Sequence, residues 1–163
     1  MTDLIPAEAL AMIGTELEHR TGVVVSKEFQ RWAAAVGDLN SLYFDAEFAR
    51  QHGYREVIMP PLFLPHVVTG VADLDDLRPD GIPAVAPAGK VPLGTPRRMA
   101  GGEDTTFLQP VYPGDVITAV RVLTDLAAKQ GRSGEFVVLS WQVTYTNQDG
   151  AVVARTDGTT IAR

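Results

Sequence analysis

The chain has 163 residues, no cysteine and a formal net charge of −6, and 45% of its residues are hydrophobic. This length predicts one domain over residues 1–163, with a core that needs neither disulfides nor cysteine-based metal sites. The acidic balance argues against nucleic-acid binding, and the absence of a basic leader or a membrane-length apolar run predicts a cytoplasmic protein without membrane spans.

The N-terminal part predicts two helices separated by a strand. Apolar side chains recur at helical spacing over residues 6–17 and predict the first helix. The β-branched run 23–25 predicts a short strand. Ser26 is a suitable N-cap for the second helix, which carries Phe29 and Trp32 on one apolar face as expected core residues.

The stretch 32–63 organises the chain. The second helix is expected to break at Gly37, where a polar turn follows. A short third helix comes next, which Asp45 can cap and Gly53 can end. The apolar residues 62–74 then predict a buried helix.

The remainder predicts a long loop followed by strands. Residues 73–100 are rich in proline and glycine and predict either a functional flap, holding the most mobile residues, or a solvated insertion. Alternating apolar positions and turn residues then predict four strands. We expect an α+β fold whose antiparallel sheet ends in a four-stranded meander, with strands at residues 104–109, 116–126, 136–147 and 151–162.

Several motifs in the middle and at the end of the chain resemble one family. The run Gly37-Asp38-x-Asn40-x-x-Tyr43-x-Asp45 resembles the signature of MaoC-like (R)-specific enoyl-thioester hydratases and dehydratases. The later segments GGEDTTFLQPVYPGD, GRSG and TYTNQDG continue the resemblance, which is closest to the FAS1-like dehydratase N-terminal branch. It implies the hotdog fold, in which an antiparallel β-sheet wraps around a long central helix.

The resemblance also implies the position of the chemistry. In catalytic members, a D-x-N-x-x-H elbow supplies an Asp and a His, and an H-G pair at the start of the central helix supplies an oxyanion-binding N–H. Asp38 and Asn40 occupy the elbow here, but Tyr43 takes the His position and Pro60-Pro61 replaces the H-G pair. A phenol is a poor base at neutral pH, and proline has no N–H to donate. Without the family, Asp38 and Asn40 favour a turn-forming role over a catalytic one.

An acyl-binding slot with no cofactor and no metal is the expected site. The three histidines, His19, His52 and His66, lack metal-ligand spacing, and His66 is expected to be a core residue. The Arg97-Arg98 pair could hold coenzyme A phosphates. The predicted substrate-binding residues are Pro60, Pro61, Leu62, Phe63, Arg97 and Arg98.

The resemblance therefore implies a hotdog subunit of an (R)-specific enoyl-thioester hydratase or 3-hydroxyacyl-thioester dehydratase in fatty acid or polyketide metabolism. In this interpretation the chain shapes the acyl tunnel beside a catalytic Asp/His partner, in a homodimer or a heterodimer. Its ligand would be a thioester of coenzyme A or of an acyl carrier protein. Two alternatives stay open, namely a self-sufficient enzyme that uses Asp38 with Tyr43 and a non-enzymatic acyl-thioester-binding subunit.

Overall fold

The computed structural model of the chain describes residues 4–70, 73–77, 79, 81, 87–95 and 97–163. Helices are labelled α, short 3₁₀ helices η and strands β. No helix among these residues is long and apolar enough to cross a membrane. In chain order the elements are α1 (Ala7–Leu10), β1 (Glu16–Val23), α2 (Ser26–Val36), η1 (Ser41–Tyr43), α3 (Ala46–Gln51), η2 (Pro61–Phe63), α4 (Leu64–Val68), η3 (Leu74–Asp76), η4 (Pro87–Lys90), β2 (Arg98–Phe107), β3 (Val116–Gly131), β4 (Gly134–Thr146) and β5 (Val152–Ala162).

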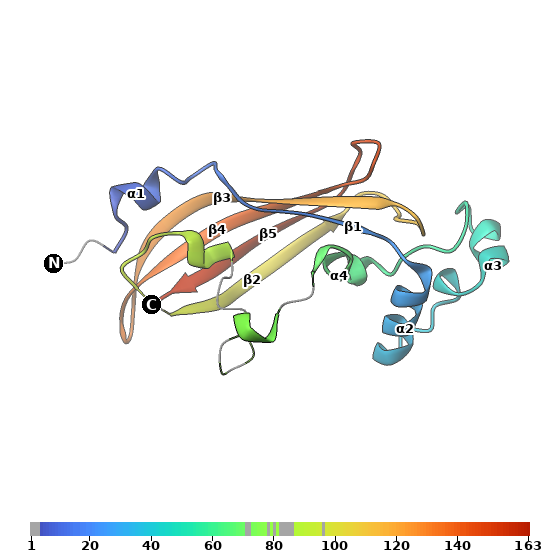
Figure 1. The fold of residues 1–163 in the computed structure, drawn as a ribbon, viewed down its shortest axis with the longest axis horizontal. Helices are drawn as coiled ribbons and strands as arrows, with labels where there is room; N and C mark the ends of the chain where they lie inside the picture. The colour runs from blue at the N-terminus through green and yellow to red at the C-terminus, as the bar shows by residue number, and fades with distance from the viewer. Residues whose placement is uncertain (1–3, 71–72, 78, 80, 82–86, 96) are drawn as a thin grey trace.

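The five strands form one antiparallel sheet in the order β1-β3-β4-β5-β2, which confirms the α+β class (Figure 1). The expected four-stranded meander is wrong at its first strand. β2 pairs with β5 instead of β3, so only β3, β4 and β5 form a meander. Local turn chemistry predicts the hairpins, but it carries no information about a pairing across fifty residues.

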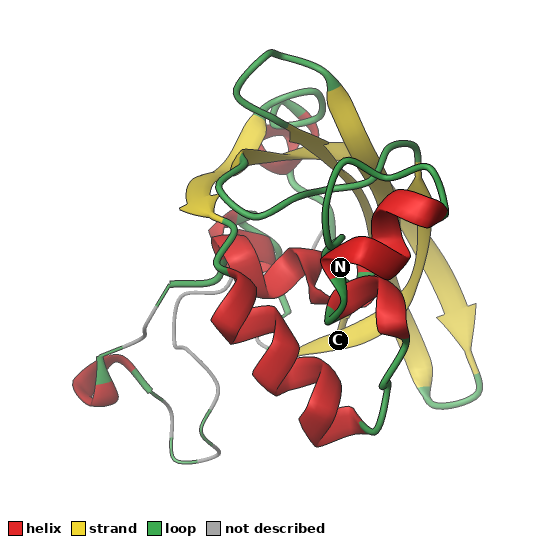
Figure 2. Cartoon of the chain, turned by 90° about the vertical axis from the view of Figure 1, so that its right-hand side faces the viewer, coloured by secondary structure: helices red, strands yellow, loops and turns green. Residues whose placement is uncertain are grey.

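The helices lie mainly at one end of the sheet, with α2 and α3 beyond the strand ends and α4 against one face (Figures 1 and 2). Phe29 and Ala33 of α2 are fully buried and pack in one cluster with Phe63 and Leu64. Gly37 ends α2 in the left-handed conformation, with φ of 78°, as the sequence predicts. A second apolar cluster fills the opposite half of the sheet.

Two predictions about capping have opposite outcomes. The Asp45 carboxylate accepts from the backbone N–H groups of Glu47 and Phe48 at 2.9 and 3.0 Å, so the predicted cap of α3 is confirmed. The predicted Ser26 cap is wrong. Val25 occupies the N-cap position and Ser26 is already helical, with no side-chain cap on α2.

The N-terminal helix predicted over residues 6–17 is also wrong in extent. α1 has only four residues, and β1 has already begun at Glu16. The strand predicted at 23–25 is instead the end of β1, which stops at Val23. Most of β1 carries polar side chains, so no alternating apolar pattern marks it as a strand.

The buried helix expected over residues 62–74 is much shorter than predicted. The helical segment consists of η2 followed by α4 and ends at Val68. The separate 3₁₀ helix η3 starts at Leu74. Prolines at 61 and 65 remove backbone donors from its first turns. The Thr69 hydroxyl donates to the Pro65 carbonyl at 2.7 Å, and Thr69 itself has an extended backbone conformation that ends the helix.

Gly22 allows α4 to approach β1 closely. A Cβ atom at this position would lie 1.8 Å from the backbone oxygen of Val67. We therefore expect Gly22→Ala to destabilise the fold by about 1–3 kcal/mol, because one packed element must shift. Urea unfolding measures this cost. Gly102→Ala is the matched control, since a Cβ there meets nothing within 4 Å. Equal stabilities of the two variants would contradict the close packing.

The predicted loop 73–100 overlaps a strand, because β2 starts at Arg98. Its described C-terminal part is anchored to the sheet. Lys90 Nζ donates to the Leu17 carbonyl at 2.6 Å, and Ala88 and Val91 are buried in the second cluster. The mobility prediction remains a prediction, and residues 78, 80, 82–86 and 96 lie outside the described residues.

Candidate functional site

The predicted catalytic residues lie together on the elbow between α2 and α3. Asn40 Oδ1 accepts from the Leu42 backbone N–H at 3.1 Å and thereby caps η1. Tyr43, the last residue of η1, is buried with only 7% of its surface exposed. The side chains of Asp38 and Asn40 both lie close enough to its phenol to influence its pKa. Asn40 therefore has a demonstrable turn-forming role, and Asp38 faces the residue that replaces the family's histidine.

The environment of Tyr43 keeps its phenol protonated. Burial raises its pKa above the ordinary 10, the nearby Asp38 carboxylate raises it further, and the Asn40 hydrogen bond opposes them. A phenolate general base is therefore not accessible near neutral pH, although the phenol can donate a hydrogen bond.

The raised pKa of Tyr43 makes a testable prediction about alkaline pH. The folded state holds this proton more tightly than the unfolded state, so the associated stability is present below pH 10. It is lost as pH rises through the higher folded-state pKa. In an absorbance titration of the four tyrosines, Tyr43→Phe should remove amplitude from the phase above pH 10. Loss of amplitude at or below pH 10 instead would contradict this environment.

An apolar pocket of about 260 Å³ lies beside the elbow. Among the described residues, Tyr54, Ile58 and Pro61 line this apolar pocket, whereas Asp38, Asn40 and Tyr43 do not. It is nevertheless adjacent to them, because the Ile58 N–H donates to the Leu42 carbonyl at 3.0 Å, and the phenol of Tyr54 contributes to the raised pKa of Tyr43. The other lining residues are Met59, Leu64, Phe107, Leu108, Gln109, Pro110, Val111 and Val153.

The start of the α4 segment lacks the backbone N–H that an H-G pair would supply to the oxyanion. Pro60 is fully buried as the N-cap of η2, and Pro61 is its first residue, so the first backbone N–H after them belongs to Leu62. Of the predicted substrate-binding residues here, Pro61 lines the apolar pocket and Leu62 lines a smaller pocket next to it. Phe63 is part of the core.

Arg97 and Arg98 are not brought to this site. Arg98 begins β2 and Arg97 directly precedes it, whereas Phe107 ends the strand, so roughly 30 Å of strand separates Arg98 from the apolar pocket. The Arg98 guanidinium also donates to the carbonyls of Ala88 and Val91, each at 3.3 Å, and to that of Thr95. Arg98 therefore anchors the preceding segment to the strand.

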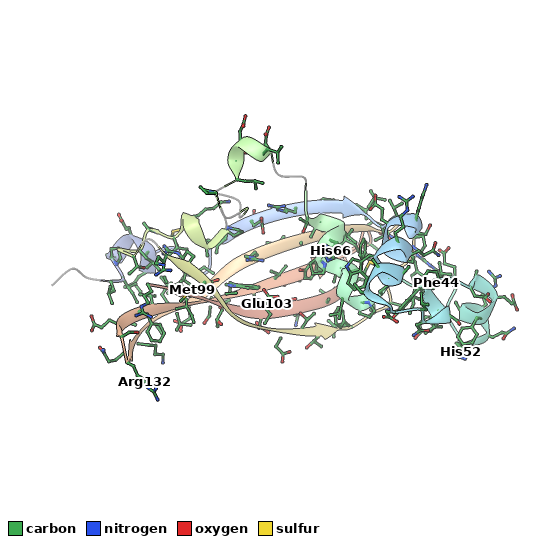
Figure 3. All side chains as sticks on the ribbon, turned by 90° about the horizontal axis from the view of Figure 1, so that it is seen from below. Phe44, His52, His66, Met99, Glu103 and Arg132 are labelled. Atoms are coloured by element: carbon green, nitrogen blue, oxygen red, sulfur yellow. The ribbon has the colours of Figure 1, made fainter. Side chains whose placement is uncertain are left out.

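His66 does not fit its predicted core position. It is exposed, and its ring lies against those of Trp32 and Phe63, with centroids 5.8 and 5.4 Å apart (Figure 3). The short α4 explains this, because one side of the segment is not covered. Within the described ranges, no group of three His, Asp or Glu side chains could hold a metal ion.

Sequence reasoning missed a structural network beneath the elbow. The buried Asp115 carboxylate accepts from the Tyr112 N–H at 2.8 Å and from Arg55 at 3.0 Å. The Arg55 guanidinium lies 4.0 Å above the Tyr112 ring. The Pro113-Gly114 turn signal marks this bend, but only the structure shows that Asp115 ties it to the segment after α3.

Comparison with known families identifies this arrangement. The family described as FAS1-like, dehydratase domain region, matches residues 11–156. The chain belongs to the FAS1-like dehydratase domain family. A UPF0336 protein of Parafrankia sp. is 31% identical over 130 residues, covering 78% of this chain and 76% of the relative. A UPF0336 protein of Thermobifida fusca is 26% identical over 133 residues, covering 82% and 80%.

Solved structures confirm the hotdog fold of this FAS1-like dehydratase domain. The ChsH1-ChsH2 complex from Mycobacterium tuberculosis contains a similar chain, with a TM-score of 0.73 and 23% identity over 95% of this chain and 89% of that one. An (R)-hydratase from A. caviae has a TM-score of 0.64 at 19% identity, covering 91% and 94%. The HadBC dehydratase complex from Mycobacterium tuberculosis has a TM-score of 0.63 at 18% identity, covering 93% and 97%.

Proposed function

We propose that this chain is the tunnel-shaping subunit of an (R)-specific enoyl-thioester hydratase or 3-hydroxyacyl-thioester dehydratase, and that a partner hotdog supplies the catalytic Asp/His pair. One observation carries the proposal. An apolar pocket lies beside the family's elbow, yet the elbow presents a protonated phenol and the adjacent helical segment starts with two prolines. This combination supports a role in binding the substrate without the usual base and oxyanion donor.

The chemistry explains why a partner is needed. Hydration of an enoyl thioester needs a base to activate water and a donor to stabilise the enolate-like oxygen. Tyr43 cannot serve as the base near neutral pH, and neither Pro60 nor Pro61 has an N–H for the oxyanion. The ligand that fits the apolar pocket is the acyl part of a coenzyme A or carrier-protein thioester.

The surface beside the apolar pocket supports association with a second hotdog. Large apolar side chains are exposed near the elbow and at the end of β2, among them Leu39, Leu62 and Leu108, with 68%, 69% and 51% of their surface accessible. Two of the neighbours in the fold comparison are complexes by name, ChsH1-ChsH2 and HadBC.

We therefore expect a dimer by light scattering at micromolar concentration, and a clean monomer would count against a self-pairing surface.

Filling the apolar pocket tests the binding role directly. Leu108 lies on its rim, so Leu108→Trp should weaken binding of a saturated acyl-coenzyme A by about tenfold in calorimetry. Leu74→Trp is the matched control, because Leu74 is 81% exposed on η3 and does not line the pocket. No binding by the wild-type chain, or equal binding by both variants, would overturn the proposal.

A further inference from the structure

Three adjacent pockets follow the helix-facing side of the sheet beneath α4. The apolar pocket shares Leu64 and Phe107 with a smaller one of about 100 Å³, here called the connecting pocket. The connecting pocket in turn shares Pro65 and Tyr145 with a third of about 360 Å³, here called the arginine pocket.

The lining changes from apolar to polar along this path. The connecting pocket adds Glu103, Thr105 and Thr156, and Glu103 lies about midway along the sheet (Figure 3). The arginine pocket is lined by Glu18, Arg20 and Arg121 together with the Tyr145 phenol. A plain hydrocarbon tail entering it would remove charged groups from water without replacing their hydrogen bonds, which is unfavourable.

Arg121 contributes a buried side-chain donor to this pocket. Its guanidinium lies 4.0 Å above the Trp141 ring, which fixes its plane. Its Nε is buried and unbonded among the described residues, because the Glu18 carboxylate is 3.8 Å away, beyond hydrogen-bonding distance. Glu18 instead accepts from Arg20 Nε at 2.7 Å.

The charges of the arginine pocket favour an anion. Arg20 and Arg121 contribute two positive charges and Glu18 one negative charge, which leaves one net positive charge on the described lining. The Glu18 carboxylate lies 2.7 Å from Arg20 Nε and 3.8 Å from Arg121 Nε, so one negative charge is shared by two arginines and one positive charge is left unmatched. A guanidinium held in one plane, with an unpaired Nε donor, fits a carboxylate, which can accept two parallel hydrogen bonds.

We propose that the arginine pocket receives the distal end of the acyl group, and that it selects acyl thioesters whose chain ends in a carboxylate over those that end in a methyl group. This inference rests on the proposed function, because the thioester end would lie toward the apolar pocket and the elbow. The tail would then run through the connecting pocket, across about three strand spacings from β2 to β3, or roughly 14 Å.

Calorimetric titration of the purified chain tests this selectivity. The probes are saturated acyl-coenzyme A thioesters of increasing length, each as a pair that differs only in a terminal carboxylate or methyl group. At the length that reaches Arg121, the carboxylate form should bind about 10- to 100-fold more tightly, the range expected for charge-assisted hydrogen bonds. Arg121→Met should remove the preference. Arg155→Met, an exposed substitution on the opposite face of β5, should preserve it.

A second variant keeps the test independent of any folding defect in Arg121→Met. Glu18→Gln removes the carboxylate that competes for Arg121, so it should increase affinity for the carboxylate-terminated thioester but not for the methyl-terminated one. Equal binding of both thioesters at every length, or an unchanged or weaker carboxylate affinity in Glu18→Gln, would overturn this inference alone. Failure of the wild-type chain to bind either thioester would overturn the proposed function as well.

Discussion

Replacing Tyr43 with histidine should leave the isolated protein without detectable hydration of crotonyl-coenzyme A or longer enoyl esters. The substitution adds an imidazole to the elbow beside Asp38, but Pro60 and Pro61 still offer no N–H to the oxyanion. General acid–base catalysis contributes about 10²–10⁴-fold and an oxyanion donor about 10²–10³-fold. Restoring one contribution therefore leaves the rate below that of a complete site by about two to three orders of magnitude.

The informative comparison is with Tyr43→His combined with Pro61→Gly. Pro61 is exposed and lines the apolar pocket, so this change restores an N–H at the start of η2 without disturbing the buried Pro60. We expect measurable hydration by the double variant and its loss when Asp38→Asn is added, because no carboxylate then holds the imidazole. Activity in the Tyr43→His single variant would show that a donor other than the proline pair serves the oxyanion.

Asp115→Ala should destabilise the protein by about 2–3 kcal/mol, because it removes a buried carboxylate from the network beneath the elbow. The substitution leaves the Tyr112 N–H and the Arg55 guanidinium without their acceptor. The cost stays below that of a fully buried ion pair because the Arg55 side chain is 58% exposed.

Urea unfolding measures the cost of Asp115→Ala, with Asp104→Ala as the matched control. Asp104 is exposed on the edge strand β2, so its removal should change the free energy of unfolding by about 0.5 kcal/mol or less. A midpoint for Asp115→Ala indistinguishable from that of Asp104→Ala would show that the network beneath the elbow contributes little.

Elements fixed by local chemistry could be predicted from the sequence. The β3–β4 and β4–β5 turns follow from glycine-containing segments, and the Asp45 cap of α3 follows from its position before a short helical run. The two edge strands, β1 and β2, are harder to predict from the sequence. β1 is mostly polar, and most side chains of β2 are exposed, so neither shows the alternation that marks a half-buried strand.

The same distinction applies to the candidate site, where residues contiguous in the sequence could be predicted and residues brought together by the fold could not. The elbow is contiguous in sequence, so its residues and the replacement of histidine by Tyr43 are visible without a structure. The arginine pocket is not, because Glu18, Arg121 and Tyr145 meet only through the register of three strands. Arg97 and Arg98 are adjacent in sequence but lie far from the apolar pocket in the fold, and their phosphate-binding role remains a prediction.

The most direct test of the tunnel-shaping role is a hydration assay on the purified wild-type chain, free of other hotdog proteins, against a panel of enoyl-coenzyme A esters. We predict no turnover by the chain alone, because the phenol of Tyr43 is protonated and the proline pair donates no hydrogen bond. Turnover should appear when a partner hotdog with an intact D-x-N-x-x-H elbow is added, above the rate of the partner alone. Robust turnover by the wild-type chain without any partner would contradict the account.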